Sequence, residues 1–222
     1  MKCKENSEDL TRQLEAFPGT GRYAGDAFPS LFVNLGAGVL AAYFSGYLDF
    51  DDFNHTAWFE KPLPWNEVEK LSFREDNEWW QYTQAVTRLC ADVAKDRFVL
   101  GMTDIGGILD VLASLRGTEN LLMDLVAEPE RVNRMRGRIL EAWHRVYDGL
   151  APVVAEVQQG MSSWLRIWCP GDYFPLQCDF CAMISPAMFD TFVASDIQEQ
   201  CRRLGHGLFH LDGPGQIPHV ET

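Results

Sequence analysis

Short apolar runs alternate along the chain with longer segments in which apolar residues recur every three or four positions. The short runs predict strands at residues 31–35, 98–102, 164–168 and 207–211, with a weaker candidate at 176–179. The repeated strand-helix order is typical of βα units that build a parallel sheet. Two architectures have this pattern, an open doubly wound sheet and a closed (β/α)8 barrel, and periodicity alone does not choose between them.

The longer segments predict three clear helices. One begins after Pro129 and buries a stripe of apolar residues spaced by three and four: Val132, Met135, Ile139, Trp143, Val146, Leu150 and Val153. Its other face carries arginines that we expect to be solvated beside acidic neighbours: Arg131, Arg134, Arg138 and Arg145. Another opens at Ser185, a good N-cap, with Pro186 first in the helix, and runs through Ile197. The third covers residues 76–92.

Composition narrows the class of protein. The 222 residues are 46% apolar and 12% aromatic, which is enough for a packed core, and no linker divides residues 1–222, so one domain is expected. The net charge of −13 argues against nucleic acid. The sequence contains no apolar run of about 18 residues and no secretory signal, so we expect a cytoplasmic protein without a membrane partner.

Six cysteines are spread through the chain, at Cys3, Cys90, Cys169, Cys178, Cys181 and Cys201. This spacing does not indicate a disulfide framework, and we expect most of them to be reduced and buried. Cys178 and Cys181 form a single C-x-x-C, which fits either packing or a thiol or metal role.

Polar residues that directly follow the apolar runs are the candidates for function, because ligands of both architectures bind beyond the carboxyl ends of the strands. The first set contains Asn34 and Gly36, and the second contains Thr103, Asp104, Gly106 and Gly107. The third contains Gln177, Cys178, Asp179 and Cys181, and the last contains His210, Asp212 and Gly213.

Asp104 is either an acid, base or ligand anchor, or merely the cap of the next helix. The pair Gly106–Gly107 lets a ligand approach backbone N–H groups, although its spacing does not match a dinucleotide-binding loop. Asp110 and Arg116 are expected to form a structural ion pair or to cap a loop.

His210 and Asp212 alternate with Leu211 and thus point to the same side of a strand, which suits a divalent metal or a proton-transfer pair. His219 is either a further ligand or an exposed tail residue. Trp58, Trp164 and Trp168 fall near predicted strands, where they either pack in the core or form the wall of a substrate site.

Five segments together resemble the uroporphyrinogen decarboxylase superfamily, which includes corrinoid-dependent methyltransferases: DAFPSLFVNLGAG, HTAWFE, LGMTDIGGILDVLASLRGTENLLMDLVAEPERV, QCDFCAMISPAMFDTFV and FHLDGPG. The resemblance extends from about residue 26 to the last residue. It implies a (β/α)8 barrel with its site at the carboxyl ends of the strands. Members extend beyond this sequence at both ends, so the resemblance implies a barrel that is incomplete at both ends.

The sequence departs from the decarboxylases at three places. Arg12 and Arg22 do not reproduce their arginine-rich motif, Asn34 stands where they have an essential aspartate, and Asp179 is followed by Phe180 in place of serine. An amide cannot balance the positive charge of a pyrrole cation. These differences argue against decarboxylation of uroporphyrinogen, which is retained as the alternative activity.

The methyltransferase branch implies a zinc site, in which His210 takes the place of the family's histidine and Asp212 that of its cysteine. A carboxylate is a harder ligand than a thiolate, so zinc or another divalent metal is expected there with a weaker hold. The resemblance favours a methyltransferase acting on a methylated small molecule or corrinoid, with Asp104, Asp179 and His210 catalytic. Asn34, Trp58, Gly106, Gly107 and Trp168 are expected to bind substrate.

The partners expected are a small-molecule substrate and a corrinoid protein. Uncovered edges of a partial barrel also favour a homo-oligomer. The competing hypothesis of another class is a non-catalytic truncated barrel whose surface serves association.

Overall fold

Three small sheets form the β structure of this protein in a computed structural model that describes residues 7–51, 56–59 and 61–221. Strand β1 (Ser30–Phe32) pairs in parallel with β4 (Val99–Gly101), and β5 (Tyr173–Gln177) pairs in parallel with β6 (His206–His210). Strand β2 (Asp49–Asp51) pairs antiparallel with β3 (Thr56–Trp58). The described residues therefore have a mixed α/β fold with small sheets and do not show the complete barrel sheet.

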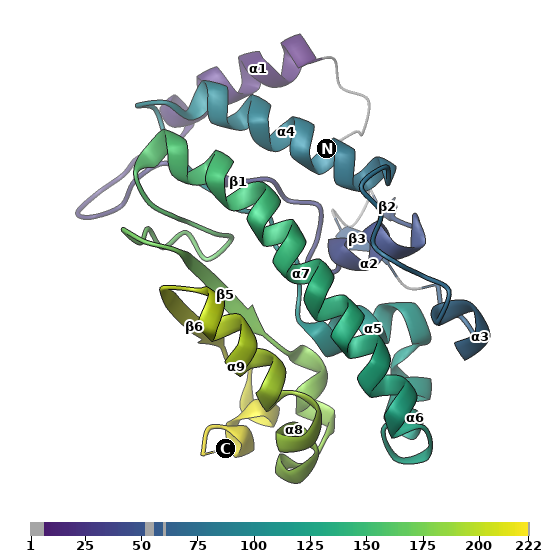
Figure 1. Ribbon diagram of the computed structural model, residues 1–222. Helices are drawn as coiled ribbons and strands as arrows, with labels where there is room; N and C mark the ends of the chain where they lie inside the picture. Colours follow the sequence, from purple (N-terminus) through teal and green to yellow (C-terminus); the bar gives the residue numbers. More distant parts are fainter. Residues whose placement is uncertain (1–6, 52–55, 60, 222) are drawn as a thin grey trace.

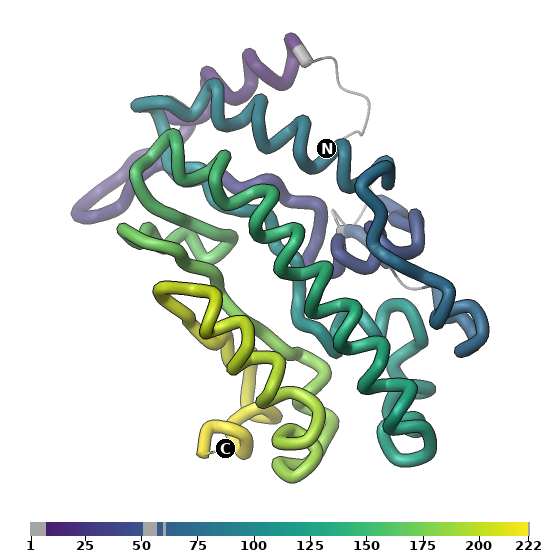
Figure 2. Tube along the Cα trace, in the orientation of Figure 1, coloured from purple at the N-terminus to yellow at the C-terminus, as the bar shows by residue number. Residues whose placement is uncertain are grey.

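The helices form a layer over the strands (Figure 1). They are α1 (Ser7–Ala16), α2 (Val39–Ser45), α3 (Trp65–Val68), α4 (Glu78–Ala94), α5 (Ile108–Arg116), α6 (Thr118–Ala127), α7 (Pro129–Gln158), α8 (Pro186–Phe192) and α9 (Ala194–Arg203). Short 3₁₀ helices occur at η1 (Phe17–Thr20), η2 (Asp179–Met183) and η3 (Pro214–His219). Helix α7 lies beside α4 across the front, and α1 and the C-terminus lie at opposite ends (Figures 1 and 2).

Helix α7 confirms the long helix predicted from apolar spacing. Its apolar stripe is buried apart from the half-buried Val153, and Trp143 stacks on Tyr147 and meets the edge of Phe174 from β5. The arginine face is solvated with acidic partners, as expected: Arg134 lies 3.3 Å from Glu69 and Arg145 lies 2.6 Å from Glu75. The core therefore lies between the helical layer and the strands.

Side-chain caps begin two of the predicted helices. The Oγ of Ser185 accepts a hydrogen bond from the N–H of Met188, which confirms the predicted start of α8. Asn77 caps α4 by accepting from Trp79 and Trp80, so this helix begins at Glu78 and ends at Ala94. The helix predicted through Ile197 is interrupted at Val193, whose backbone (φ −123°, ψ −47°) lies outside helical values.

The strand predicted at residues 164–168 is wrong. In its place, the side chain of Gln158 bonds to both the N–H and the carbonyl of Leu100 in β4, at 2.8 and 2.9 Å. Ser162 adds one backbone bond by accepting from Met102 at 2.9 Å. The chain then turns at Arg166, where φ is +58°, and returns so that Met161 pairs antiparallel with Cys169. The side chain of Gln158 thus provides the hydrogen-bond partners that a neighbouring strand would otherwise give to the backbone of Leu100 in β4.

The other predicted strands are present with shifted bounds. β1 and β4 are three residues each, shorter than the runs at 31–35 and 98–102, while β5 starts before the predicted 176–179 and β6 matches 207–211 within one residue. None of the helices in the described part of the chain is long and apolar enough to cross a membrane.

Candidate functional site

A cleft of about 320 Å³ lies where the chain leaves β1, β3 and β5. Its lining comes from five segments of the chain: Gly36, Ala37 and Gly38; Ala57, Trp58 and Phe59; Asp110 and Ser114; Gln177; and Asp179. Residues from distant parts of the sequence meet here: they come from the segment after β1, from β3, from α5, and from the end of β5 and the residues that follow it. This is the region in which the polar residues after the strands were expected.

Asp104 is buried beside the cleft, with 8% of its surface exposed. Its Oδ1 accepts hydrogen bonds from the N–H of Gly106 and from the Nε2 of Gln177, each at 2.9 Å. Burial raises the pKa of Asp104 to about 6, and the charges of Asp179 and Asp110 add to the effect while the two hydrogen bonds oppose it. Asp104 does not cap α5, whose N-cap residue is Gly107. Through these two hydrogen bonds, Asp104 connects the β4–α5 loop to Gln177 at the end of β5.

Asp110 connects the same loops from the first turn of α5. Its Oδ1 accepts from the N–H of Phe180 at 2.7 Å and its Oδ2 from the N–H of Asp179 at 3.1 Å. Burial raises the pKa of Asp110 to about 6, although the hydrogen bond from Phe180 acts to lower it. Of the two roles expected from the sequence, Asp110 therefore caps a loop. Arg116 pairs instead with Asp124, at 2.8 Å.

The pair Gly106–Gly107 allows backbone segments to approach closely. Gly106 has a φ of +73°, and a Cβ there would lie 2.5 Å from the carbonyl oxygen of Ala37. A Cβ at Gly107 would lie 2.2 Å from the carbonyl oxygen of Gln177. The glycines thus bring β4 and α5 against the residues that line the cleft, and direct binding of substrate by their N–H groups stays a prediction.

Asp179, His210 and Asp212 lie near one another at the ends of β5 and β6. Asp179 is exposed as a whole, but partial burial of its carboxyl group, together with the charge of Asp212, raises its pKa. His210 opposes this shift. Gln216 of η3 connects this group, because its Oε1 accepts from the N–H of Asp212 at 2.9 Å and its Nε2 donates to the carbonyl of Cys178 at 3.3 Å. The structure therefore brings the three predicted residues into one electrostatic group.

One ring nitrogen of His210 is free to bind a metal ion. Its Nδ1 is buried and has no hydrogen-bond partner, and its ring meets Trp164 edge-on at 4.9 Å. However, within residues 7–51, 56–59 and 61–221, no three His, Cys, Asp or Glu side chains are placed to hold one metal ion. His219 is not the exposed tail residue considered from the sequence: it is buried, it stacks on Phe189, and its Nε2 lies 2.8 Å from the carbonyl oxygen of Cys181.

The remaining predicted residues are divided between the cleft and other surfaces. Trp58 lines the cleft and is 53% exposed. Asn34 shapes the cleft through its Oδ1, which accepts from the N–H of Gly36 at 3.0 Å. Trp168 is 42% exposed and lies against Gly160, and it is not among the described residues that line the cleft.

The cysteines of the C-x-x-C are both buried. The Cys178 thiol donates a hydrogen bond to the sulfur of Cys181, and this bond together with burial raises the pKa of Cys178. Cys90 is also buried, Cys169 is half-buried and Cys201 is exposed, and all five are free thiols, while Cys3 lies outside the described residues.

Sequence reasoning missed Asp110, Ser114 and Gln216 as parts of the site. Asp110 lies three residues after Gly107, in the first turn of a helix that begins at a strand end, and this position was the available signal. No sequence signal marks Gln216.

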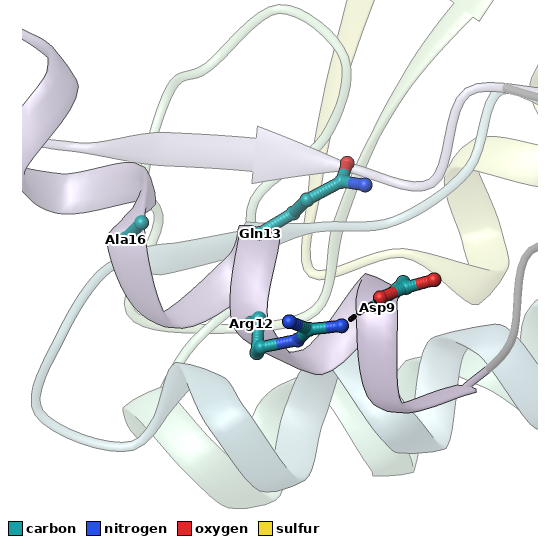
Figure 3. A pocket seen from close by; sticks show the side chains of 4 residues that line it. All are labelled: Asp9, Arg12, Gln13 and Ala16. Atoms are coloured by element: carbon teal, nitrogen blue, oxygen red, sulfur yellow. Dashed lines mark hydrogen bonds and ion pairs between the residues drawn. The ribbon is translucent and has the colours of Figure 1, made fainter.

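A second hollow lies on α1 and is lined by Asp9, Arg12, Gln13 and Ala16 (Figure 3). All four residues come from this one helix, and Arg12 already pairs with Asp9. The hollow is far from the strand ends in sequence and lacks convergent groups from other elements, so it is the flank of a helix and not a candidate site.

Comparison with known proteins gives a structural match only. No protein-family model matches the sequence, and no curated protein sequence matches it. A methyltransferase from Methanosarcina mazei has a similar structure, with a TM-score of 0.64 and 12% sequence identity, over 96% of this chain and 58% of that chain. At this identity the likeness shows a shared fold. The chain spans little more than half the length of that methyltransferase.

Proposed function

We propose that this chain is part of a (β/α)8 barrel of the uroporphyrinogen decarboxylase superfamily and acts in methyl transfer between a methylated small molecule and a corrinoid. The observation that carries the proposal is the cleft at the strand ends of a fold shared with a methyltransferase. Barrel enzymes hold their substrates at this end of the strands. The five sequence segments that resemble the superfamily include the residues around this cleft.

Asp179 is the carboxylate best placed to contact the reacting heteroatom, because it is exposed at the cleft and its pKa is raised. A carboxyl group with a raised pKa exchanges a proton more readily near neutral pH. Asp104 and Asp110 act as positioning residues, since their oxygens hold Gln177 and the N–H groups of Asp179 and Phe180.

Decarboxylation of uroporphyrinogen receives less support from the lining of the cleft. Its described charged residues are the acids Asp110 and Asp179, and no arginine or lysine is among them. A substrate with eight carboxylates needs cationic partners, for which arginine is the best residue. The amide at Asn34 adds to the same conclusion.

An anaerobic absorbance titration of the purified protein tests the proposal. We expect methylcobalamin to give a saturable spectral change and uroporphyrin to give none, because the acidic lining repels a polycarboxylate. The protein unfolded in urea is the control for nonspecific association. Binding of uroporphyrin alone would support the decarboxylase instead. No binding of either compound would contradict methyl transfer and favour a non-catalytic chain that serves association with a copy of itself.

A divalent metal, with zinc as the first choice, is a separate proposal. His210 and Asp212 would hold it, and water or substrate would have to complete the ligands. Bound there, the metal would supply Lewis-acid polarisation of the reacting heteroatom. We expect about one equivalent of metal in the purified protein and its loss in His210→Ala, measured by elemental analysis, whereas His206→Ala at the exposed start of β6 retains it. Equal metal content in both variants would show that His210 is not a ligand of the metal.

A further inference from the structure

The charged side chains that line the cleft in the described part of the chain are all carboxylates. Asp110 and Asp179 line it, and Asp104 lies behind Gln177, whose side chain bonds to it. Arg116 and Lys61 are close in sequence to residues of the cleft but do not line it: Arg116 pairs with Asp124, and the Nζ of Lys61 lies over the ring of Tyr47. The lining therefore presents a negative surface to a ligand.

The carboxylates also repel one another. The charge of Asp179 raises the pKa of both Asp104 and Asp110. The burial of Asp104 and Asp110 makes this repulsion stronger than it would be in water. A bound cation would relieve it, and an anion would increase it.

An aromatic wall faces the same space. Trp58 lines the cleft with 53% of its surface exposed, which is high for the largest apolar side chain. Phe59 is buried next to it, and glycines make room for this ring: a Cβ at Gly36 or Gly38 would lie 2.7 or 2.5 Å from Phe59. The exposed face of Trp58 is suited to a cation whose charge is surrounded by apolar groups, such as methyl groups.

The size of the cleft limits the ligand. Its volume of about 320 Å³ is near the lower end of the range for small-molecule sites. Ser114 and Gln177 add a hydroxyl and an amide that can orient a polar substituent. A compact ion with one polar group therefore fits this lining better than a macrocycle does.

We propose that the cleft binds a small methylated ammonium ion, with the methylated nitrogen against Trp58 and its charge balanced by Asp179 and Asp110. This inference rests on the proposed function in one respect: it takes the ammonium ion to be the methylated substrate of that reaction. The binding itself does not depend on methyl transfer, so it is measured separately.

Calorimetric titration of the full chain with choline and with 3,3-dimethylbutan-1-ol tests the inference, because the two compounds have the same shape and differ in charge. We expect choline to bind at least about tenfold more tightly, a difference of about 1.4 kcal/mol. Trp58→Leu and Asp179→Asn are each expected to weaken choline binding about tenfold. The matched controls Trp168→Leu and Asp190→Asn, which lie outside the cleft lining, leave it unchanged.

Equal affinity for choline and the uncharged alcohol would overturn the inference, as would an equal loss of affinity in Trp58→Leu and Trp168→Leu. If methylcobalamin binds but choline shows no preference, methyl transfer is retained and the ammonium substrate is wrong. If choline binds as expected while neither methylcobalamin nor uroporphyrin does, the cation site is retained and the methyl-transfer proposal fails.

Discussion

Gly107→Ala is expected to lower the free energy of unfolding by about 3 kcal/mol, because the new methyl group has no space. Its Cβ would lie 2.2 Å from the carbonyl oxygen of Gln177 and 2.3 Å from the Oδ2 of Asp110. The first contact is with backbone at the end of β5, and the second is with a carboxylate held by two N–H groups. Neither can move without separating α5 from the segment that lines the cleft.

Urea unfolding of Gly107→Ala and of Gly137→Ala measures this effect with a matched control. Gly137 lies within α7, and a Cβ there would meet nothing within 4 Å. Alanine is preferred over glycine inside a helix by about 1 kcal/mol, so Gly137→Ala should be more stable than the parent protein. If Gly107→Ala is as stable as the parent protein, the close approach of α5 to β5 is wrong.

Asp104→Asn is expected to raise the free energy of unfolding at pH 7.5 by about 2 to 3 kcal/mol. Burial raises the pKa of this carboxyl to about 6, from about 3.9 for an ordinary aspartate, and each unit of such a shift corresponds to about 1.4 kcal/mol. Asparagine keeps an Oδ1 that accepts from Gly106 and Gln177, and it carries no charge. The substitution therefore removes the unfavourable burial of an ionised group.

The sign of the pH dependence separates this explanation from a packing effect. The folded state binds the proton of Asp104 more tightly than the unfolded state does, so ionisation destabilises the protein fully above about pH 6 and not below pH 4. The stability difference between Asp104→Asn and the parent protein should close as the pH falls from 7.5 to 4. The exposed Asp190→Asn should show no difference at either pH. A difference that persists at pH 4 would contradict ionisation as its cause.

Local sequence signals predicted the two longest helices, α4 and α7, and the helical segment that begins after Ser185. The apolar spacing after Pro129 and the N-cap at Ser185 each predicted a helix that the structure contains, because these signals act between residues within one or two turns. The rule that polar residues follow the ends of strands pointed to Asp104, Asp179 and His210; in the structure Asp179 lines the cleft, Asp104 bonds to the cleft residue Gln177, and His210 ends β6. The alternation predicted that His210 and Asp212 lie on one side of a strand, but β6 ends at His210 and Asp212 lies beyond it, although both residues interact with Asp179.

Only the tertiary structure decided which groups satisfy the edges of the strands and which acids share the cleft. Gln158 takes the place of a strand beside Leu100, 58 residues away, and Asp110 holds the N–H of Phe180, 70 residues away. Neither pairing leaves a periodic signal, because the partners are distant in sequence and belong to different elements. The sequence by itself determined α4, α7, the helical segment after Ser185 and the ends of the strands β1, β4, β5 and β6 that carry polar residues. The long-range packing determined the cleft and its negative charge, since burial and proximity of carboxylates exist only in the folded chain.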